Sequence, residues 1–450
     1  YTRAVSKQPQ PSAPLSSPAN MLYAELSQLV MESAQNTEWR QQDCFNLIPS
    51  EMTPSRLVRA LSMMDPAGRY AEHAKMHMGN ETKDVKYYQA TDFIVGIEER
   101  LNAVMRSFLG ASHIESRIIS GQQSNDALFD ALVAYSNRMK KGKEPKRLHY
   151  ALVNDLKKGG HLSAQPFGAL KNYISIDPNT GRSAIENFVM QKDNPYCIDA
   201  TKTIELLDQM RAKDHDPALI VFGRSMFIHP EPINQIAKHV HDRYGEHNPQ
   251  RPFIMYDGAH VLGLLGSHFQ EPLLEGADII TGSTHKTFFG TQRGVIAGNF
   301  NNGHAYEHLW PFIEQRAFPG KVSNHHLGSL LGLYAASMEM DFFKDTYQLQ
   351  VISNAKAFAK ALKEQGLQVE GDPSHDYTQT HQVLLRVDQF QGPAIAKRLE
   401  ENNIIVNYQA LPTDLSFSAA SGLRLGVAEM TRFGMNAEHF KELAGYMAPI

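Results

Sequence analysis

The sequence is poor in cysteine, in long apolar runs and in net charge, and each shortage excludes a class of protein. Two cysteines, Cys44 and Cys197, cannot build a disulfide framework and fit a reducing compartment. No apolar run approaches the ~20 residues that a membrane-spanning helix needs. A formal net charge of −4 gives no reason to expect nucleic acid or a membrane as a partner. We expect a cytoplasmic protein, although an organellar location stays open.

Histidine is plentiful, but its spacing does not indicate a metal site. The chain has 20 histidines. No pair of them shows the HExxH spacing of a zinc-binding helix or the Cys/His spacing of a zinc finger. We therefore expect no bound metal.

The length of 450 residues exceeds what one hydrophobic core usually serves, so two domains with extensions are expected. Apolar residues make up 42% and charged residues 20%, which is ordinary for a soluble globular chain. The start is rich in proline and serine, which predicts disorder. The expected units are a disordered tail over 1–20, an N-terminal arm and helix over 21–65, a large domain over 66–335 and a small C-terminal domain over 336–450.

The apolar pattern predicts an α/β chain. Continuous apolar runs of strand length, typical of strands buried on both faces, occur at 218–223, 253–257, 277–281 and 294–298. Helical spacing occurs at 21–42, 124–139, 327–340 and 351–365. Strands that alternate with helices in this way favour a largely parallel central sheet. Further strands near 382–387, 404–408 and 423–427 predict a smaller α+β domain at the C-terminus.

A lysine and an aspartate follow two of the predicted strands. Asp257 ends the run 253–257, and Lys286 lies in a hydroxyl-rich loop after the run 277–281. Open α/β sheets build their sites at such strand ends. Pyridoxal phosphate needs a lysine that binds its aldehyde as an imine and a carboxylate that keeps its pyridine nitrogen protonated. Each residue alone is better explained as a surface lysine or a helix cap, but the pair in this setting favours a pyridoxal phosphate site.

Three further features suit such a site, and each also has a purely structural explanation. The segment Ser120–Asn125 precedes a helix, whose free N–H groups either bind phosphate or are simply capped. His161 follows two glycines, where its ring either lies flat on the pyridine or serves the fold. Arg424 stands on a short predicted strand, where its guanidinium either binds a carboxylate at two points or forms a structural ion pair.

Taken together and in order, the motifs of the chain resemble the serine hydroxymethyltransferase family. The resemblance runs from about Asn46 to the C-terminus. The motifs that carry it are Asn46-Leu-Ile-Pro-Ser-Glu51, Arg69-Tyr-Ala-Glu72, Tyr87-Tyr88, Ser120-Gly121, Gly159-Gly-His-Leu162, Asp257-Gly-Ala-His260, Thr284-His-Lys-Thr287, Phe318-Pro-Gly320 and Ser421-Gly-Leu-Arg424. It implies the type I, aspartate-aminotransferase-like fold of pyridoxal phosphate enzymes, with the cofactor in the large domain.

The resemblance also implies a role for each matching residue. Lys286 is the Schiff-base lysine, Asp257 pairs with the pyridinium nitrogen, and His161 stacks on the ring. Ser225 and His260 lie around the phenolic oxygen of the cofactor. The remaining roles are phosphate binding by Ser120, Gly121 and Tyr70, binding of the substrate carboxylate by Arg424 and Ser50, acid/base chemistry by Glu72, and support of imine exchange by Tyr88.

In this family the active site is shared between subunits. The resemblance therefore implies a homodimer in which Tyr70, Glu72 and Tyr88 serve the other subunit, and it leaves open whether dimers pair into tetramers. Small-molecule partners are an amino acid and tetrahydrofolate. Leu156 and Leu162 match apolar positions that pack on the folate, whereas Gln409 stands where the family often has an asparagine near it.

Two departures from the family pattern border the site. Fourteen residues separate Glu72 from Tyr87, more than the short link expected in the family. After Phe318-Pro-Gly320 the chain continues as Lys-Val-Ser-Asn-His-His326 in place of a glycine-rich turn. The segment 377–383 also looks like relatives that act on α-methylserine or transfer a glycyl unit from threonine. Substrate choice is therefore open.

Three functions compete at this point. The leading hypothesis is a hydroxymethyltransferase that acts on serine or α-methylserine with tetrahydrofolate as the one-carbon acceptor. The second is a folate-independent aldolase or transaldolase for threonine-like substrates. The third is a catalytically dead protein of the same fold kept as a binding partner, which the intact Lys286, Asp257, His161, Glu72 and Arg424 disfavour. Neither the stereochemical preference nor tolerance of a methyl group on Cα follows from the sequence.

Overall fold

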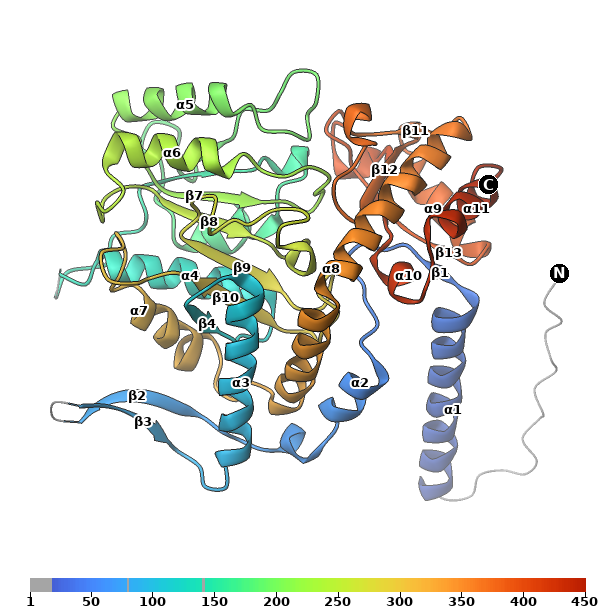
Figure 1. Cartoon of the computed structure of the whole chain (residues 1–450), viewed down its shortest axis with the longest axis horizontal. Helices are drawn as coiled ribbons and strands as arrows, with labels where there is room; N and C mark the ends of the chain where they lie inside the picture. Colours follow the sequence, from blue (N-terminus) through green and yellow to red (C-terminus); the bar gives the residue numbers. More distant parts are fainter. Residues whose placement is uncertain (1–17, 79–80, 140–141) are drawn as a thin grey trace.

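The computed structural model describes residues 18–78, 81–139 and 142–450 and shows a large sheet-based body beside a smaller one (Figure 1). Most of the predicted tail, residues 1–17, lies outside the described residues. Helix α1 (Pro18–Glu38) begins within the last residues of that predicted tail and continues as a single π-helical turn over Trp39–Asp43. None of the helices in the described ranges is long and apolar enough to cross a membrane.

A seven-stranded sheet forms the centre of the large body. Its strand order is β4-β10-β9-β8-β7-β5-β6. The strands are β4 (His113–Glu115), β5 (Tyr150–Val153), β6 (Ile185–Asn187), β7 (Pro217–Gly223), β8 (Phe253–Asp257), β9 (Ile279–Ser283) and β10 (Gly294–Gly298). From β6 to β9 all neighbours are parallel, whereas β10 runs antiparallel to both β9 and β4. The predicted α/β architecture with a mostly parallel sheet is confirmed.

Both faces of this sheet are buried because its strands are apolar at successive positions. Ile220 and Phe222 of β7 join one hydrophobic cluster, and Leu219 and Val221 join another. Helices α3 (Asp92–Leu109) and α6 (Ile233–Tyr244) contribute to the first cluster, and α4 (Gly121–Ser136) and α7 (Trp310–Gln315) to the second. Helix α5 (Ala200–Ala212) packs beside α6. Alternate side chains of the strand thus pack into two hydrophobic cores, one on each face, as expected for a sheet covered by helices on both sides.

A second, antiparallel sheet builds the small body, in the order β11-β12-β15-β14. Its strands are β11 (Gln368–Val369), β12 (Gln382–Arg386), β14 (Asn407–Gln409) and β15 (Gly422–Gly426), and α9 (Gly392–Glu401), α10 (Ala428–Arg432) and α11 (Ala437–Met447) complete it. The N-terminal arm joins it through β1 (Phe45–Asn46), which pairs in parallel with β13 (Ile404–Ile405). This places the arm residues that follow β1 beside the small sheet.

One helix connects the two bodies where the sequence predicts two. Helix α8 (Leu327–Glu364) runs without interruption for 38 residues, so the separate helices expected at 327–340 and 351–365 are wrong. The linking residues 341–350 contain neither glycine nor proline, so nothing ends the first helix. Helix α2 (Arg56–Ser62) packs against α8. The boundary that we propose between the domains, after residue 335, lies inside α8.

A second feature that the sequence did not predict concerns the long link between Glu72 and Tyr87. It forms a two-stranded antiparallel ribbon, β2 (His73–Met78) and β3 (Glu81–Lys86), that projects from the large body (Figure 1). Apolar and polar residues do not alternate clearly along this link, because side chains on both faces of most of the ribbon are polar or exposed. Sequence periodicity therefore has little to detect there.

Candidate active site

Lys286 lies in the loop between β9 and β10, and threonine side chains fix this loop. The Thr284 hydroxyl donates to the carbonyl of Thr291 at 2.8 Å, and the Thr287 hydroxyl donates to the carbonyl of His260 at 3.1 Å. The Lys286 amine lies 3.1 Å from His260 Nε2. Burial lowers the pKa of this lysine to about 8. The positive charge of Arg424 lowers the pKa further, and the negative charge of Asp257 offsets only part of the decrease. The amine is therefore neutral far more often than a surface lysine.

Asp257 ends β8 with its side chain 1% exposed. Its carboxylate accepts hydrogen bonds from His161 Nδ1, from Asn125 Nδ2 at 2.7 Å and from the backbone N–H of Ala259 at 3.1 Å. Burial alone would raise the pKa of Asp257, but the interactions with His161 and Asn125 outweigh it and lower the pKa. The structure thus provides a buried carboxylate that stays charged, which is what a protonated pyridine nitrogen requires.

Helix α4 begins at Gly121, three residues earlier than the sequence pattern predicts. Ser120 is its N-cap, and the Ser120 hydroxyl accepts from the N–H of Gln123 at 3.1 Å. A Cβ atom on Gly121 would come within 2.1 Å of the Ser283 hydroxyl, so only glycine allows the helix start to approach the end of β9 this closely. The first turn of α4 therefore presents free N–H groups to an anion beside the Lys286 loop.

Arg424 stands on β15 with its side chain almost buried. Its Nε–H donates to Asn407 Oδ1 at 3.2 Å, and Nη1 donates to the carbonyl of Ser225 at 2.9 Å. Burial lowers its pKa to about 10. No carboxylate forms an ion pair with Arg424 in the ranges that the structure describes. A buried, oriented guanidinium without an acidic partner is suited to bind the carboxylate of a ligand.

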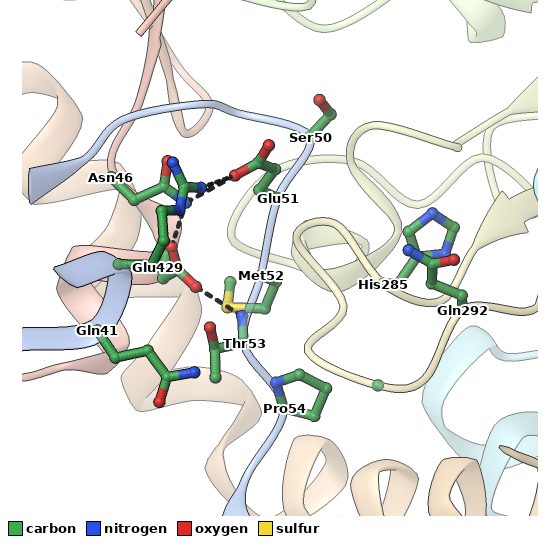
Figure 2. A pocket seen from close by; sticks show the side chains of 12 residues that line it. Gln41, Asn46, Ser50, Glu51, Met52, Thr53, Pro54, His285, Gln292 and Glu429 are labelled. Atoms are coloured by element: carbon green, nitrogen blue, oxygen red, sulfur yellow. Dashed lines mark hydrogen bonds and ion pairs between the residues drawn. The ribbon is translucent and has the colours of Figure 1, made fainter. Parts of the chain in front are cut away.

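The N-terminal arm closes one side of the site. Ser50 and His285 line the same cavity of about 370 Å³, which also includes Glu51, Gln292 and Glu429 (Figure 2). The arm is held there because the buried Glu429 accepts from the backbone N–H of Thr53 at 2.6 Å and from the Asn46 amide. Sequence reasoning missed Glu429 as a residue that shapes the site, since nothing in its local pattern separates it from a surface helix residue.

His381 is a second residue that sequence reasoning did not single out. Its ring is fully buried, and Nε2 donates to the carbonyl of Pro49 at 3.2 Å. Burial, with smaller effects of Arg424 and Lys286, lowers the pKa of His381 to about 3, so the ring is neutral. It ties the arm next to Ser50 to β12. Its place inside the segment 377–383, which the sequence marks as relevant to substrate choice, was the only available signal.

Tyr70, Glu72 and Tyr88 form a separate group at the base of the ribbon. The rings of Tyr70 and Tyr88 lie 5.4 Å apart, and both tyrosines are exposed. Partial desolvation and the charge of Glu72 raise the pKa of Tyr88. In the described parts of the chain no hydrogen bond or ion pair joins these three residues to Lys286 or Arg424. The structure therefore brings together two groups of predicted site residues but does not join them within one chain.

The residues predicted near folate lie on the surface beside the main group. Leu156 and Leu162 are 38% and 52% exposed and occupy short 3₁₀ turns after β5. Lys158, in the first of these turns, donates to the carbonyl of Pro412 at 3.1 Å. That contact joins the turns to the segment that follows Gln409 on β14. The two exposed leucines of these turns provide apolar surface to which a planar ring could bind.

The geometry fits pyridoxal phosphate. The ring needs an amine, a charged partner for its nitrogen and a phosphate cup, and Lys286, Asp257 and the start of α4 supply them. The buried Nδ1 of His260 has no hydrogen-bond partner in the described structure, so the residue that contacts the Lys286 amine also carries an unsatisfied polar atom. In the same ranges no cluster of histidine, cysteine or carboxylate side chains has the arrangement of a metal site.

Comparisons with known proteins agree with this chemistry. The family model described as serine hydroxymethyltransferase matches residues 24–447. The serine hydroxymethyltransferase of Pyrobaculum aerophilum is 36% identical over 434 residues, which cover 96% of this chain and 90% of that protein. The enzyme of the same name from Sulfolobus acidocaldarius is 33% identical and covers 95% and 88%.

A solved structure shares the fold over almost the whole chain. The L-threonine transaldolase from Pseudomonas fluorescens superposes with a TM-score of 0.77 at 25% identity, covering 96% of this chain and 88% of that one. The expected type I fold of pyridoxal phosphate enzymes is thereby confirmed.

Proposed function

This chain belongs to the serine hydroxymethyltransferase family, and from that premise we propose that it moves the hydroxymethyl group of serine or α-methylserine to tetrahydrofolate. It is a pyridoxal phosphate enzyme that transfers one-carbon groups. The observation that carries the proposal is the buried Arg424 without an acidic partner, next to an amine of lowered pKa and a buried charged carboxylate. Arg424 would bind the carboxylate of the amino acid, Lys286 would bind the aldehyde of the cofactor, and Asp257 would pair with the nitrogen of the cofactor ring.

Arg424 and Ser50 would bind the substrate carboxylate. Asn407 and the Ser225 carbonyl hold the guanidinium in one orientation, so the carboxylate it binds is oriented too. Orientation decides the reaction, because the bond at Cα that stands perpendicular to the cofactor ring is the one that breaks. When bound, pyridoxal phosphate supplies the electron sink for that step. Asp257 would keep the ring nitrogen protonated, and His161, which donates to Asp257, holds this carboxylate in place.

Proton transfer at the substrate hydroxyl would fall to Glu72. A carboxylate placed near that hydroxyl can take its proton as the Cα–Cβ bond breaks and return it when the bond forms again. In the described structure Glu72 interacts with Tyr88, and no hydrogen bond or ion pair joins it to Lys286 of the same chain. We therefore propose that Tyr70, Glu72 and Tyr88 act in the site of the other subunit of a homodimer, with Tyr70 binding the phosphate and Tyr88 supporting amine exchange.

Further proposals concern the residues that bind folate and cofactor, the cellular location and the oligomeric state. We propose that Leu156 and Leu162 pack on the folate ring and that Gln409 hydrogen-bonds its edge. His260 and Ser225 would surround the phenolic oxygen of the cofactor, and Ser120 and Gly121 would bind its phosphate. We also propose that the enzyme acts in the cytoplasm, that dimers are the active unit, and that tetramers of two dimers are the alternative assembly.

A second candidate is a folate-independent transaldolase for threonine-like substrates. The structural likeness to an L-threonine transaldolase favours it, as does Gln409 in place of the family's asparagine. The retained Glu72 argues for hydroxymethyl transfer.

Amino-acid release separates the two candidates. The purified enzyme is given serine, α-methylserine or threonine, each with and without tetrahydrofolate. Release from serine or α-methylserine that requires folate supports the proposal, and the faster substrate identifies the specificity. Release that ignores folate and is fastest with threonine would replace the proposal by the transaldolase.

A further inference from the structure

Two of the segments in which this chain departs from the family pattern approach the same buried carboxylate. His73 opens the ribbon β2–β3, and its Nε2 lies 2.9 Å from Oε2 of Glu98 on α3. His325 lies in the segment that replaces the glycine-rich turn, and its Nε2 lies 2.8 Å from Glu98 Oε1. Glu98 is 5% exposed and His325 is fully buried. One oxygen of this buried glutamate therefore hydrogen-bonds to His73, and the other lies within ion-pair distance of His325 without the geometry of a hydrogen bond.

The same contacts fix the base of the ribbon. The other nitrogen of His73, Nδ1, lies 2.8 Å from Asp84 Oδ1 on the opposite strand. The Glu72 carbonyl accepts from the N–H of Tyr87 at 3.1 Å, so Glu72 and Tyr87 face each other where the ribbon starts. His73 follows Glu72 directly, and Tyr88 follows Tyr87. Any shift of His73 relative to α3 therefore shifts Glu72 and Tyr88 together.

Hydrogen bonds also connect the loop that carries His325 to the segment before Tyr70 and to the central sheet. The Asn324 amide donates to the carbonyl of Arg69 at 3.2 Å, next to Tyr70. Arg293 Nη1 donates to the carbonyl of His325 at 2.6 Å, which anchors the loop to the start of β10. The carboxylate at the centre is thus held between the ribbon, α3 and a loop that is itself fixed to the central sheet.

We propose that His73, Glu98 and His325 form a positioning bridge that sets where Glu72 and Tyr88 stand, and through them the rate of hydroxymethyl transfer. This rests on the proposed function, in which Glu72 handles the substrate hydroxyl. None of the three bridge residues is among those that we place around the substrate or the cofactor. His73 and His325 lie in the two segments in which the sequence departs from the expected family pattern, and Glu98 on α3 lies between them.

Electrostatics agrees with a charged bridge. Burial disfavours the charged imidazole of His73, but its hydrogen bonds to Glu98 and Asp84 outweigh burial and raise its pKa. Burial would raise the pKa of Glu98, and the two histidines lower it instead. The other charged group that contacts His73 is Arg117, which donates to its backbone carbonyl at 3.4 Å. The ion pair that His73 forms with Glu98 and Asp84 is complete below the ordinary histidine pKa of 6.5 and weakens as the pH rises through the raised pKa of His73.

The test compares His73→Gln, Glu98→Gln and His325→Gln in the holoenzyme. For each, kcat and KM for folate-dependent glycine formation from serine are measured together with retention of pyridoxal phosphate. We expect kcat to fall on the order of 10- to 100-fold, the loss that a displacement of about 1 Å causes, with KM for serine and cofactor retention unchanged. The matched control is His268→Gln, which removes a surface histidine paired with Asp345 at 2.9 Å and should keep wild-type rates.

Two further readouts separate positioning from a general loss of structure. If the residues act as one unit, the double variant His73→Gln/Glu98→Gln should lose no more than the worse single variant. The decline of kcat as the pH rises through the His73 pKa should be present in the wild type and absent in His73→Gln. If these residues only stabilised the fold, the losses of the two single variants would add in the double variant. His73→Gln would then also keep the decline of kcat that the wild type shows as the pH rises.

Amide hydrogen exchange at Tyr87 reports on the bridge without activity. It should be faster in all three variants than in the wild type and His268→Gln. Wild-type kcat in the bridge variants, or a parallel loss of kcat, serine affinity and cofactor, would overturn the positioning bridge. A wild-type enzyme that releases no amino acid from either serine or α-methylserine with folate would instead overturn the proposed function, and the exchange at Tyr87 would still show whether the bridge holds the ribbon.

Discussion

The amine of Lys286 lies 3.1 Å from Nε2 of His260, and both groups lose their charge more easily than in water. Burial and the nearby Lys286 and Arg424 lower the pKa of His260 well below 6.5, so its ring is neutral and Nε2 can accept from the lysine. Burial also lowers the pKa of Lys286 to about 8. The pair therefore keeps an uncharged nucleophile ready at a physiological pH, which a surface lysine cannot do.

The first prediction is the pH dependence of cofactor capture. Only the neutral amine attacks an aldehyde, so the rate at which the protein without cofactor binds pyridoxal phosphate covalently should rise about tenfold per pH unit below 8 and level off above it. Stopped-flow absorbance measures this rate. A rate that keeps rising up to pH 10 would show that Lys286 has an ordinary pKa.

The second prediction concerns the identity of the lysine. Lys286→Ala should reduce turnover to background, because the variant lacks the amine that we expect to bind the aldehyde. Reduction with borohydride followed by mass spectrometry should add the mass of the cofactor to the peptide with Lys286 in the wild type and to no peptide in the variant. Labelling of a different lysine would contradict the assignment.

The third prediction tests how Arg424 binds substrate. In Arg424→Lys the ammonium group cannot donate at two parallel points, so KM for serine should rise about 10- to 100-fold, the equivalent of one lost charged hydrogen bond. Cofactor retention should not change. The control is Arg386→Lys, which alters an ion pair with Glu370 at 2.6 Å away from the site. An unchanged KM in Arg424→Lys would assign the substrate carboxylate to another residue.

The fourth prediction tests the sharing of sites between subunits. Lys286→Ala and Glu72→Gln should each be inactive in folate-dependent transfer, whereas a mixture that has exchanged subunits should regain roughly a quarter of wild-type activity, since half of the dimers are mixed and each holds one intact site. Activity is measured before and after exchange. A mixture that stays inactive would place Glu72 in the same site as its own Lys286.

The parts of the fold that sequence reasoning could predict are those with strong local signals. The run Phe253–Asp257 is apolar at each position before the aspartate, and it forms β8 with the same bounds. Gly294–Gly298 likewise forms β10 as predicted, although its antiparallel direction depends on partners that the run itself does not specify. Lys286, Asp257 and Arg424 were predicted because each follows or occupies such a strand.

The rest depended on contacts between distant segments. The absence of glycine and proline from residues 341–350 allows α8 to continue, but its packing against α2, α3 and α11 involves distant segments that no local pattern shows. Glu98 is one glutamate among many on a helix surface until the fold brings His73 and His325 to it. Residues with such long-range partners carry no signal in spacing alone, and for that reason the ribbon and its anchor were not predicted.

The central claim is transfer of one carbon from the amino acid to folate, and isotope labelling tests it most directly. The enzyme is incubated with serine labelled with ¹³C at Cβ, with and without tetrahydrofolate, and the label is followed by NMR. The account predicts that the labelled carbon appears on the folate in step with the glycine formed, and that both depend on the folate. Glycine formed equally fast without folate, with the label released as free aldehyde, would contradict it.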